Sequence, residues 1–171
     1  DVEIQIGGQQ IDKHTKEYLQ IWAELTTPDS KASAYRAMTG VSGTQGSSGT
    51  GVVLTQIPLQ FWFCRNPGLA LPLIALQYHE VKLIFNWGTA GGATAKVMAD
   101  YIYLDTDERR RFAQVSHEYL IEQLQYSTGE SKQSHKLNFN HPVKELIWTD
   151  ASQITSETAK LKLNGHDRFS A

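Results

Sequence analysis

The stretch from Phe61 to Val81, FWFCRNPGLALPLIALQYHEV, is the densest apolar segment of the 171-residue chain. Pro72 lacks a backbone donor and its ring clashes with the preceding helical turn, so residues 69–76 cannot form one regular helix. The run is also far shorter than the roughly 20 residues that a membrane-spanning helix needs. An apolar run that Pro and Gly interrupt is typical of a buried strand, a tight corner and a second buried strand.

Further strands are expected on both sides of this stretch. In residues 52–64 the side chains alternate, with Phe61 and Phe63 opposite Trp62. Residues 77–87 predict another strand, which places Val81, Leu83 and Phe85 on one face. Near the start of the chain, Val2, Ile4 and Ile6 share one face of a strand at residues 2–6, and Gly7-Gly8 predicts a turn.

The later part of the chain is also mostly extended. Residues 118–126 fit either a helix or a strand, and the turn residues at 127–131 favour a strand that forms a hairpin with residues 136–148. Two more strands are predicted at residues 97–104 and 160–164.

Helices are few and short. The spacing of Tyr18, Ile21, Trp22 and Leu25 predicts an amphipathic helix over residues 13–25, with Asp12 as its cap. One or two helical turns are expected at residues 32–38. A third helix is predicted at residues 106–114, where the Thr106 hydroxyl is the expected cap and two acids suit the helix dipole. Residues 40–51 predict a loop, and residues 150–158 a polar linker.

Many short strands with few helices predict an all-β protein, a β-sandwich or barrel with short helices in its loops. The net charge of −2 and the lack of a basic cluster beyond Arg109–Arg111 predict no direct nucleic-acid partner. The single cysteine, Cys64, rules out an internal disulfide and fits a reducing compartment. Because the chain begins within a strand and not with Met, we expect it to be an internal segment of a longer protein.

No constellation of residues predicts catalysis or metal binding. The acidic run Asp105–Glu108 lacks the glycine and the further oxygen ligands of a calcium loop, so it is interpreted as a helix N-terminus. The six histidines form no HxH or HExxH pair. Cys64 is interpreted as a small buried hydrophobe, and the Gly46–Gly51 loop lacks the GKS or GKT ending of a phosphate-binding loop. We therefore expect no enzyme activity, no cofactor and no metal.

Several separated stretches resemble one family, the double-jelly-roll major capsid proteins of large icosahedral double-stranded DNA viruses of the phycodnavirus, iridovirus and mimivirus kinds. Their order and approximate spacing both match over essentially the whole chain. The stretches are Ile6–Gln9 with Ile11–His14, Ile21–Trp22 with Glu24–Thr26, Ile57–Val81, the run DYIYLDTDERRRFAQVSHEYLIEQLQ at 100–125, Leu137–Leu146 and Leu163–Phe169.

The resemblance implies a structural protein with two jelly rolls in tandem, made in the host-cell cytoplasm and located in the virion. Residues 1–149 would be most of the first jelly roll, residues 150–158 the linker, and residues 159–171 the beginning of the second. Three copies would form a pseudo-hexagonal capsomer that contacts neighbouring capsomers and minor capsid proteins. The resemblance implies no transmembrane segment.

We expect packing and assembly to depend on the stretch at 61–81, the helix at 106–114 and one late tryptophan. The predicted residues are Phe61, Trp62, Phe63, Arg65, Asn66, Leu71, Leu73, Tyr78, Arg109, Arg110, Phe112 and Trp148. Two alternatives use the same kind of scaffold: a β-sandwich carbohydrate-binding or attachment module, and a cupin-like metalloenzyme. The missing histidine motif argues against the second of these.

Overall fold

The computed structural model describes residues 1–40, 55–88, 95–128, 132, 134–149 and 159–168. The chain forms two units, residues 1–125 and residues 126–171, and each is described by itself. Residues 41–51 of the loop expected at 40–51, the first residues of the strand expected at 52–64 and the linker expected at 150–158 lie outside the described residues.

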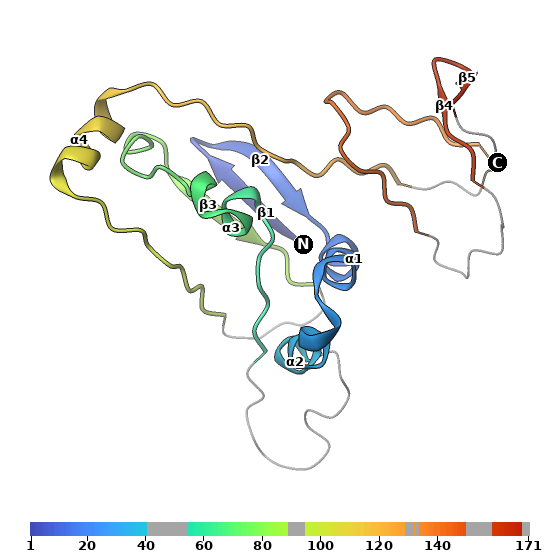
Figure 1. Ribbon diagram of the computed structural model, residues 1–171, viewed down its shortest axis with the longest axis horizontal. Helices are drawn as coiled ribbons and strands as arrows, with labels where there is room; N and C mark the ends of the chain where they lie inside the picture. The colour runs from blue at the N-terminus through green and yellow to red at the C-terminus, as the bar shows by residue number, and fades with distance from the viewer. Residues whose placement is uncertain (41–54, 89–94, 129–131, 133, 150–158, 169–171) are drawn as a thin grey trace, which may run out of the picture. The chain divides into compact units, whose positions relative to one another are not determined.

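A three-stranded antiparallel sheet organises the first unit (Figure 1). The strands are β1 (Val2–Ile6), β2 (Gln9–His14) and β3 (Val81–Phe85), in the order β2-β1-β3. Gly7 and Gly8 join β1 to β2 with positive φ angles of 59° and 81°, which is the conformation that a two-residue hairpin turn requires. The strand and turn predicted at the start of the chain are confirmed, and β3 confirms the core of the strand predicted at 77–87.

The apolar core lies on one face of this sheet. Its buried members are Val2 and Ile4 of β1 together with Phe61 and Trp62, which come from a separate segment. Partly buried side chains from all three strands and from neighbouring segments pack around these four: Ile6, Ile11, Leu19, Leu59, Phe63, Leu69, Leu71, Val81, Leu83, Phe85 and Ile121. The shared apolar face predicted for Val81, Leu83 and Phe85 is therefore confirmed.

A β-bulge interrupts the pairing of β1 with β2. Ile4 faces Asp12 and Gln5 faces Gln10, so Ile11 is the extra residue of β2. A bulge bends its strand and disrupts the local hydrogen-bond ladder. In β2 the bulge lets Ile11 pack against the core while Asp12, opposite Ile4, keeps its place on the core face.

The apolar stretch at 61–81 forms turns where the sequence predicted strands. Its first part is α3 (Trp62–Arg65), which is followed by a 3₁₀ turn, η1 (Pro67–Leu69). The strand prediction fails here because Phe61 and Trp62 are both buried, whereas successive residues of a strand point to opposite faces. The predicted corner is present: the amides of Ala75 and Leu76 both donate to the carbonyl of Pro72.

The helices lie close to where the sequence predicts them, but the residues that cap their N-termini are different ones. α1 (Lys16–Thr26) begins after Thr15, whose hydroxyl accepts from the amide of Tyr18. Asp12, the predicted cap, lies instead in β2. The predicted apolar stripe is also only partly correct, since Leu25 is exposed and Leu19 contacts the core.

Two further helices complete the first unit. α2 (Asp29–Thr39) is longer than the turns predicted at 32–38 and ends at Gly40, and Arg36 holds it to Glu24 of α1. α4 (Thr106–Gln114) has the predicted bounds, but Asp105 caps it rather than Thr106, accepting from the amide of Glu108. No helix in the described ranges is long and apolar enough to cross a membrane.

The all-β prediction is corrected by these elements. Residues 97–104, 118–126 and 136–148 were expected as strands, yet their described parts are extended without ladder pairing. The described ranges contain α-helices as well as strands, so the observed structure is a mixed α/β one.

The second unit contains a short hairpin. Its strands are β4 (Lys162–Leu163) and β5 (His166–Asp167), joined by Asn164 and Gly165, which both have positive φ. The strand predicted at 160–164 is thus confirmed in part.

Candidate functional site

Two ionisable residues of β2 lie on the apolar face of the sheet. Asp12 is 3% exposed and His14 is 1% exposed. The Nε2 atom of His14 lies 2.9 Å from Oδ2 of Asp12. This is an electrostatic contact rather than a well-aligned hydrogen bond, because Asp12 Oδ2 has no hydrogen-bond partner among the described residues. Asp12 Oδ1 accepts instead from the amides of Lys13 at 2.8 Å and Leu124 at 3.0 Å.

Aromatic rings enclose the His14 imidazole. It stacks on Phe61 with ring centroids 4.5 Å apart, and it lies 4.9 Å from Tyr18 of α1 in a tilted arrangement. The pair Asp12–His14 therefore joins β2 to α1 and to the start of α3. A buried ionisable pair is weak support for stability in itself, but removing one partner leaves the other buried without its electrostatic partner.

Arg65 lies next to this pair and connects three segments. Its guanidinium lies 4.1 Å from the ring centroid of Trp22, and its Nη2 donates to the Tyr18 hydroxyl at 2.9 Å. Its Nη1 donates to Oε2 of Glu122 at 2.7 Å. Burial raises the pKa of Tyr18, so its phenol is neutral at pH 7 and accepts from Arg65 without adding a charge.

The chemistry of this site is that of a structural polar cluster. The interpretation of Cys64 as a buried residue is wrong, because the side chain is exposed at the end of α3. Partial desolvation nevertheless raises the pKa of its thiol above the usual value, which is the opposite of an activated nucleophile. Within the described ranges, no three His, Cys, Asp or Glu side chains are grouped as a metal site. Asp105, from the acidic run, is engaged as a helix cap.

The predicted assembly residues fall into two groups. The first group lies in and around α3 and η1. Phe61, Trp62, Phe63 and Leu71 belong to the core or pack against it, Arg65 pairs with Glu122, and Asn66 is exposed. The Asn66 side chain accepts from the amide of Gly68 and so caps η1.

The second group lies outside this core. Leu73, Tyr78, Arg109, Arg110 and Trp148 are exposed, and Phe112 is half-buried against the His117 ring. Trp148 belongs to the second unit. Within the first unit, the predicted residues therefore differ in burial, and Leu73, Tyr78, Arg109 and Arg110 are surface residues.

Sequence reasoning missed Asp12, His14, Tyr18 and Glu122. A signal for the first two was present: Asp12 and His14 are two residues apart in an extended run, so both side chains lie on the same face of a strand. Nothing local in the sequence pointed to Glu122, since its contact with Arg65 joins residues 57 positions apart.

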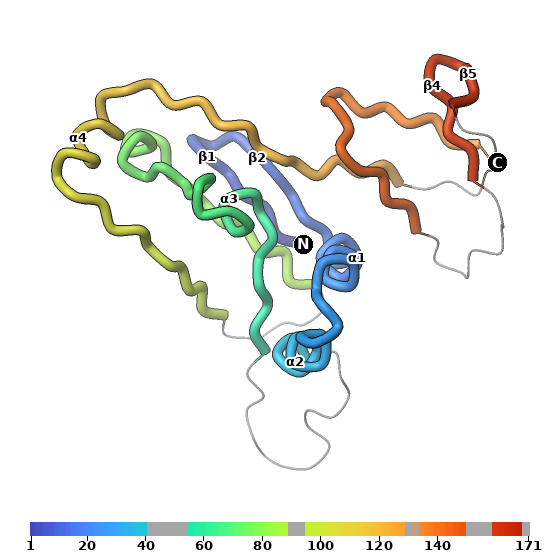
Figure 2. Tube along the Cα trace, viewed as in Figure 1, coloured from blue at the N-terminus to red at the C-terminus, as the bar shows by residue number. Residues whose placement is uncertain are grey.

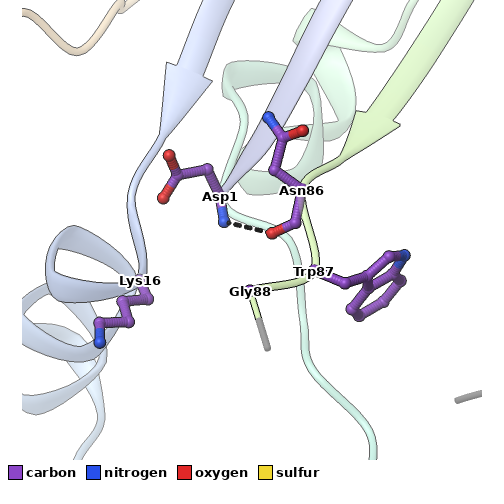
Figure 3. Close-up of a pocket in the computed structure, with 5 residues that line it drawn as sticks. All are labelled: Asp1, Lys16, Asn86, Trp87 and Gly88. Carbon is purple, nitrogen blue, oxygen red and sulfur yellow. Dashed lines mark hydrogen bonds between the residues drawn. The ribbon is translucent and has the colours of Figure 1, made fainter. Parts of the chain in front are cut away.

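A shallow pocket lies at the end of the sheet (Figure 3). It has a volume of about 400 Å³ and is lined by Asp1, Lys16, Asn86, Trp87 and Gly88. The amino group of Asp1 donates to the carbonyl of Asn86 at 3.2 Å. Figure 3 shows the Trp87 ring directed away from Asp1 and Lys16, so the aromatic face and the polar groups do not converge as they would in a sugar site.

Comparison with known proteins gives consistent matches along the chain. Residues 1–105 match the family "Major capsid protein N-terminus", and residues 108–158 match "Large eukaryotic DNA virus major capsid protein". The chain is 56% identical over 190 residues to the major capsid protein of Pyramimonas orientalis virus, covering 98% of this chain and 48% of that protein. It is 37% identical over 238 residues to the major capsid protein of Paramecium bursaria Chlorella virus 1, covering 99% of this chain and 53% of the relative.

Solved structures of a virus capsid are similar as well. The fold matches a quasi-atomic model of the PBCV-1 virus capsid with a TM-score of 0.56 and 39% identity, covering 82% of this chain and 40% of that one. It also matches PBCV-1 VP54 with a TM-score of 0.55 and 43% identity, covering 72% and 33% of the two chains. The chain spans about half the length of the curated relatives named above. It belongs to the family of major capsid proteins of large eukaryotic DNA viruses, as its sequence resemblance predicted.

Proposed function

We propose that this chain forms part of a tandem double jelly roll, and that three copies of the complete protein form a pseudo-hexagonal capsomer of an icosahedral shell. The observation that carries the proposal is the 56% identity to a major capsid protein over 98% of the chain. Identity at that level over nearly every segment supports the same architecture and the same role in assembly.

The jelly-roll boundaries are part of the proposal. Residues 1–149 are proposed as most of the first jelly roll, 150–158 as the linker and 159–171 as the beginning of the second. Support for the first comes from the β2-β1-β3 sheet, whose apolar face is covered like one wall of a sandwich. The β4–β5 hairpin at residues 162–167 is consistent with a new strand pair after residue 158, although the compact units of the chain divide between residues 125 and 126.

The two groups of assembly residues are proposed to act differently. The group around Phe61 gives the subunit its rigidity through a close-packed core. The exposed group, which includes Tyr78, Arg109 and Trp148, is proposed to contact other subunits, because exposed aromatic and arginine side chains dominate protein interfaces. Neighbouring capsomers and minor capsid proteins are the proposed partners. No direct contact with nucleic acid is proposed.

Charge reversal on α4 tests this division in the complete protein. Arg109→Glu is expected to raise the monomer fraction, measured by mass photometry, without changing the far-ultraviolet circular dichroism spectrum of the folded subunit, because Arg109 is exposed. Lys31→Glu on α2 is the matched control, since it reverses another exposed helical cation outside the proposed group. Equal trimer fractions in the two variants would contradict the proposal that Arg109 lies in the trimer interface.

A second measurement separates the capsid role from the alternative of a carbohydrate-binding module. The complete wild-type protein is expected to have three times the monomer mass and to give no signal on a glycan array. A monomer that binds a glycan would contradict the proposal and support the alternative.

A further inference from the structure

Four consecutive residues after α4, Ile121–Leu124, contact three segments that are distant in the sequence. We call these four residues the strap. Figure 2 shows the tube after α4 running back past β2, in the amber part of the chain. The hydrogen bonds below establish that the two segments lie side by side.

Each residue of the strap makes a different contact. Ile121 packs against the apolar core, and Glu122 binds Arg65 at 2.7 Å. The side-chain amide of Gln123 donates to the carbonyl of Ile11 at 2.5 Å. The backbone amide of Leu124 donates to Asp12 Oδ1 at 3.0 Å. The strap is thus attached to β2 at two points and to α3 at a third.

These contacts lie along an edge of the sheet. Among the described strands, β2 pairs with β1 alone, so its other side is an edge of this sheet. An edge strand presents unpaired backbone groups that other strands can bind. At Ile11 the bulge disrupts the spacing of these groups, so a neighbouring backbone cannot pair with β2 in regular register. Side chains of Gln123 and Asp12 supply the hydrogen bonds that a ladder would otherwise make.

We propose that the strap closes the outer edge of β2 and that three hydrogen bonds hold it: Glu122 with Arg65, Gln123 with the Ile11 carbonyl, and the Leu124 amide with Asp12. Weakening one of these bonds makes the strap open more often as a unit while the sheet stays folded. Few of its contacts are buried backbone bonds, and Glu122 and Gln123 are exposed. Regions with such contacts open locally at lower free energy than a core sheet does.

Hydrogen exchange measured by mass spectrometry on the complete protein tests this device. Glu122→Gln weakens the hydrogen bond to Arg65 with little change in side-chain size. Amides of residues 121–125 are expected to exchange about tenfold faster, the effect of losing one charge-assisted hydrogen bond. The amides of β1 are expected to keep the wild-type rate. Glu118→Gln is the matched control, because Glu118 is an exposed glutamate of the same segment outside the strap.

A second substitution tests whether the strap opens as a unit. Gln123→Ala removes the hydrogen bond to the Ile11 carbonyl and is expected to accelerate all the amides of residues 121–125 together, because they exchange through the same opening. Unchanged exchange at 121–125 in Glu122→Gln would overturn the proposal. Acceleration of only part of residues 121–125, or an equal acceleration in β1, would also overturn it.

Discussion

Asp12 is the single residue on which the polar contacts of the sheet face converge. It contacts the Lys13 and Leu124 amides through one oxygen and lies beside His14 through the other, all in a buried position. A carboxylate in such a place is retained only while its partners compensate its loss of water.

Replacing Asp12 therefore has a defined expected effect. Asp12→Ala leaves His14 buried without its carboxylate and removes the acceptor of two amides, so it is expected to destabilise the protein by about 3 kcal/mol. Chemical denaturation measures the change. Gln10→Ala, at an exposed position of the same strand, is the control and is expected to change stability by less than about 0.5 kcal/mol. Equal unfolding midpoints for the two variants would contradict the importance of the pair.

The two glycines of the β1–β2 turn allow a matched comparison. A Cβ at Gly7 would lie 2.8 Å from Nδ1 of His79, whereas a Cβ at Gly8 would meet nothing within 4 Å. Gly8→Ala is expected to cost about 1 kcal/mol for its positive φ alone, and Gly7→Ala is expected to cost more. Thermal unfolding measures both. If the steric account is right, adding His79→Ala brings Gly7→Ala close to the level of Gly8→Ala; a double variant no better than Gly7→Ala would disprove it.

The contribution of the Cys64 thiol to folding stability depends on pH, and the raised pKa gives the sign of that dependence. Desolvation raises its pKa, so the folded state favours the protonated thiol. The stability that this provides is present below the pKa of the unfolded chain and is lost as the pH rises through the higher pKa of the folded state. The alkylation rate by iodoacetamide is expected to rise with pH around a higher midpoint in the native protein than in urea. A lower midpoint in the native protein would point to an activated cysteine instead.

At the scale of elements, the N-cap of α4 is a detail that composition alone did not predict. The bounds of α4 could be predicted from its composition, but the cap was assigned to Thr106 when Asp105 makes the bond. Asp105→Ala is expected to destabilise α4 by about 1 kcal/mol, which corresponds to about fivefold faster amide exchange in this helix. Thr106→Ala is expected to leave the exchange rate nearly unchanged. Faster amide exchange in Thr106→Ala than in Asp105→Ala would instead identify Thr106 as the cap.

Strands were predicted well only where local pattern and tertiary pairing agree. Val2, Ile4 and Ile6 alternate and end at Gly7-Gly8, so pattern and turn chemistry both specify β1. Residues 97–104 have the same kind of pattern, yet no ladder partner lies beside them in the described ranges. The stretch at 61–76 failed for another reason: burial of two adjacent aromatics favours a helical turn over a strand.

Contacts between distant segments could not be predicted from the residues alone. The strap joins residues 112 positions apart, and no local pattern in a single sequence encodes such a pairing. The same holds for Arg65, whose partners Tyr18, Trp22 and Glu122 come from two other segments. The polar cluster is for this reason a result of the structure, while the family was identified from the sequence.

At the scale of the whole molecule, the exposed apolar side chains are consistent with a building block. Met98, Tyr103 and Leu120 are each at least 90% exposed, and Trp148 in the second unit is exposed as well. Large exposed apolar surface usually marks a place of protein contact. A shell subunit needs such surfaces, because stable interfaces commonly bury well over about 1,000 Å².

Electron cryo-microscopy of the protein expressed from its complete open reading frame tests the central claim most directly. The account predicts pseudo-hexagonal particles of three copies, each with two jelly rolls in tandem, and with β2-β1-β3 in a wall of the first. Featureless monomers, or particles whose subunits contain a single sandwich, would contradict it.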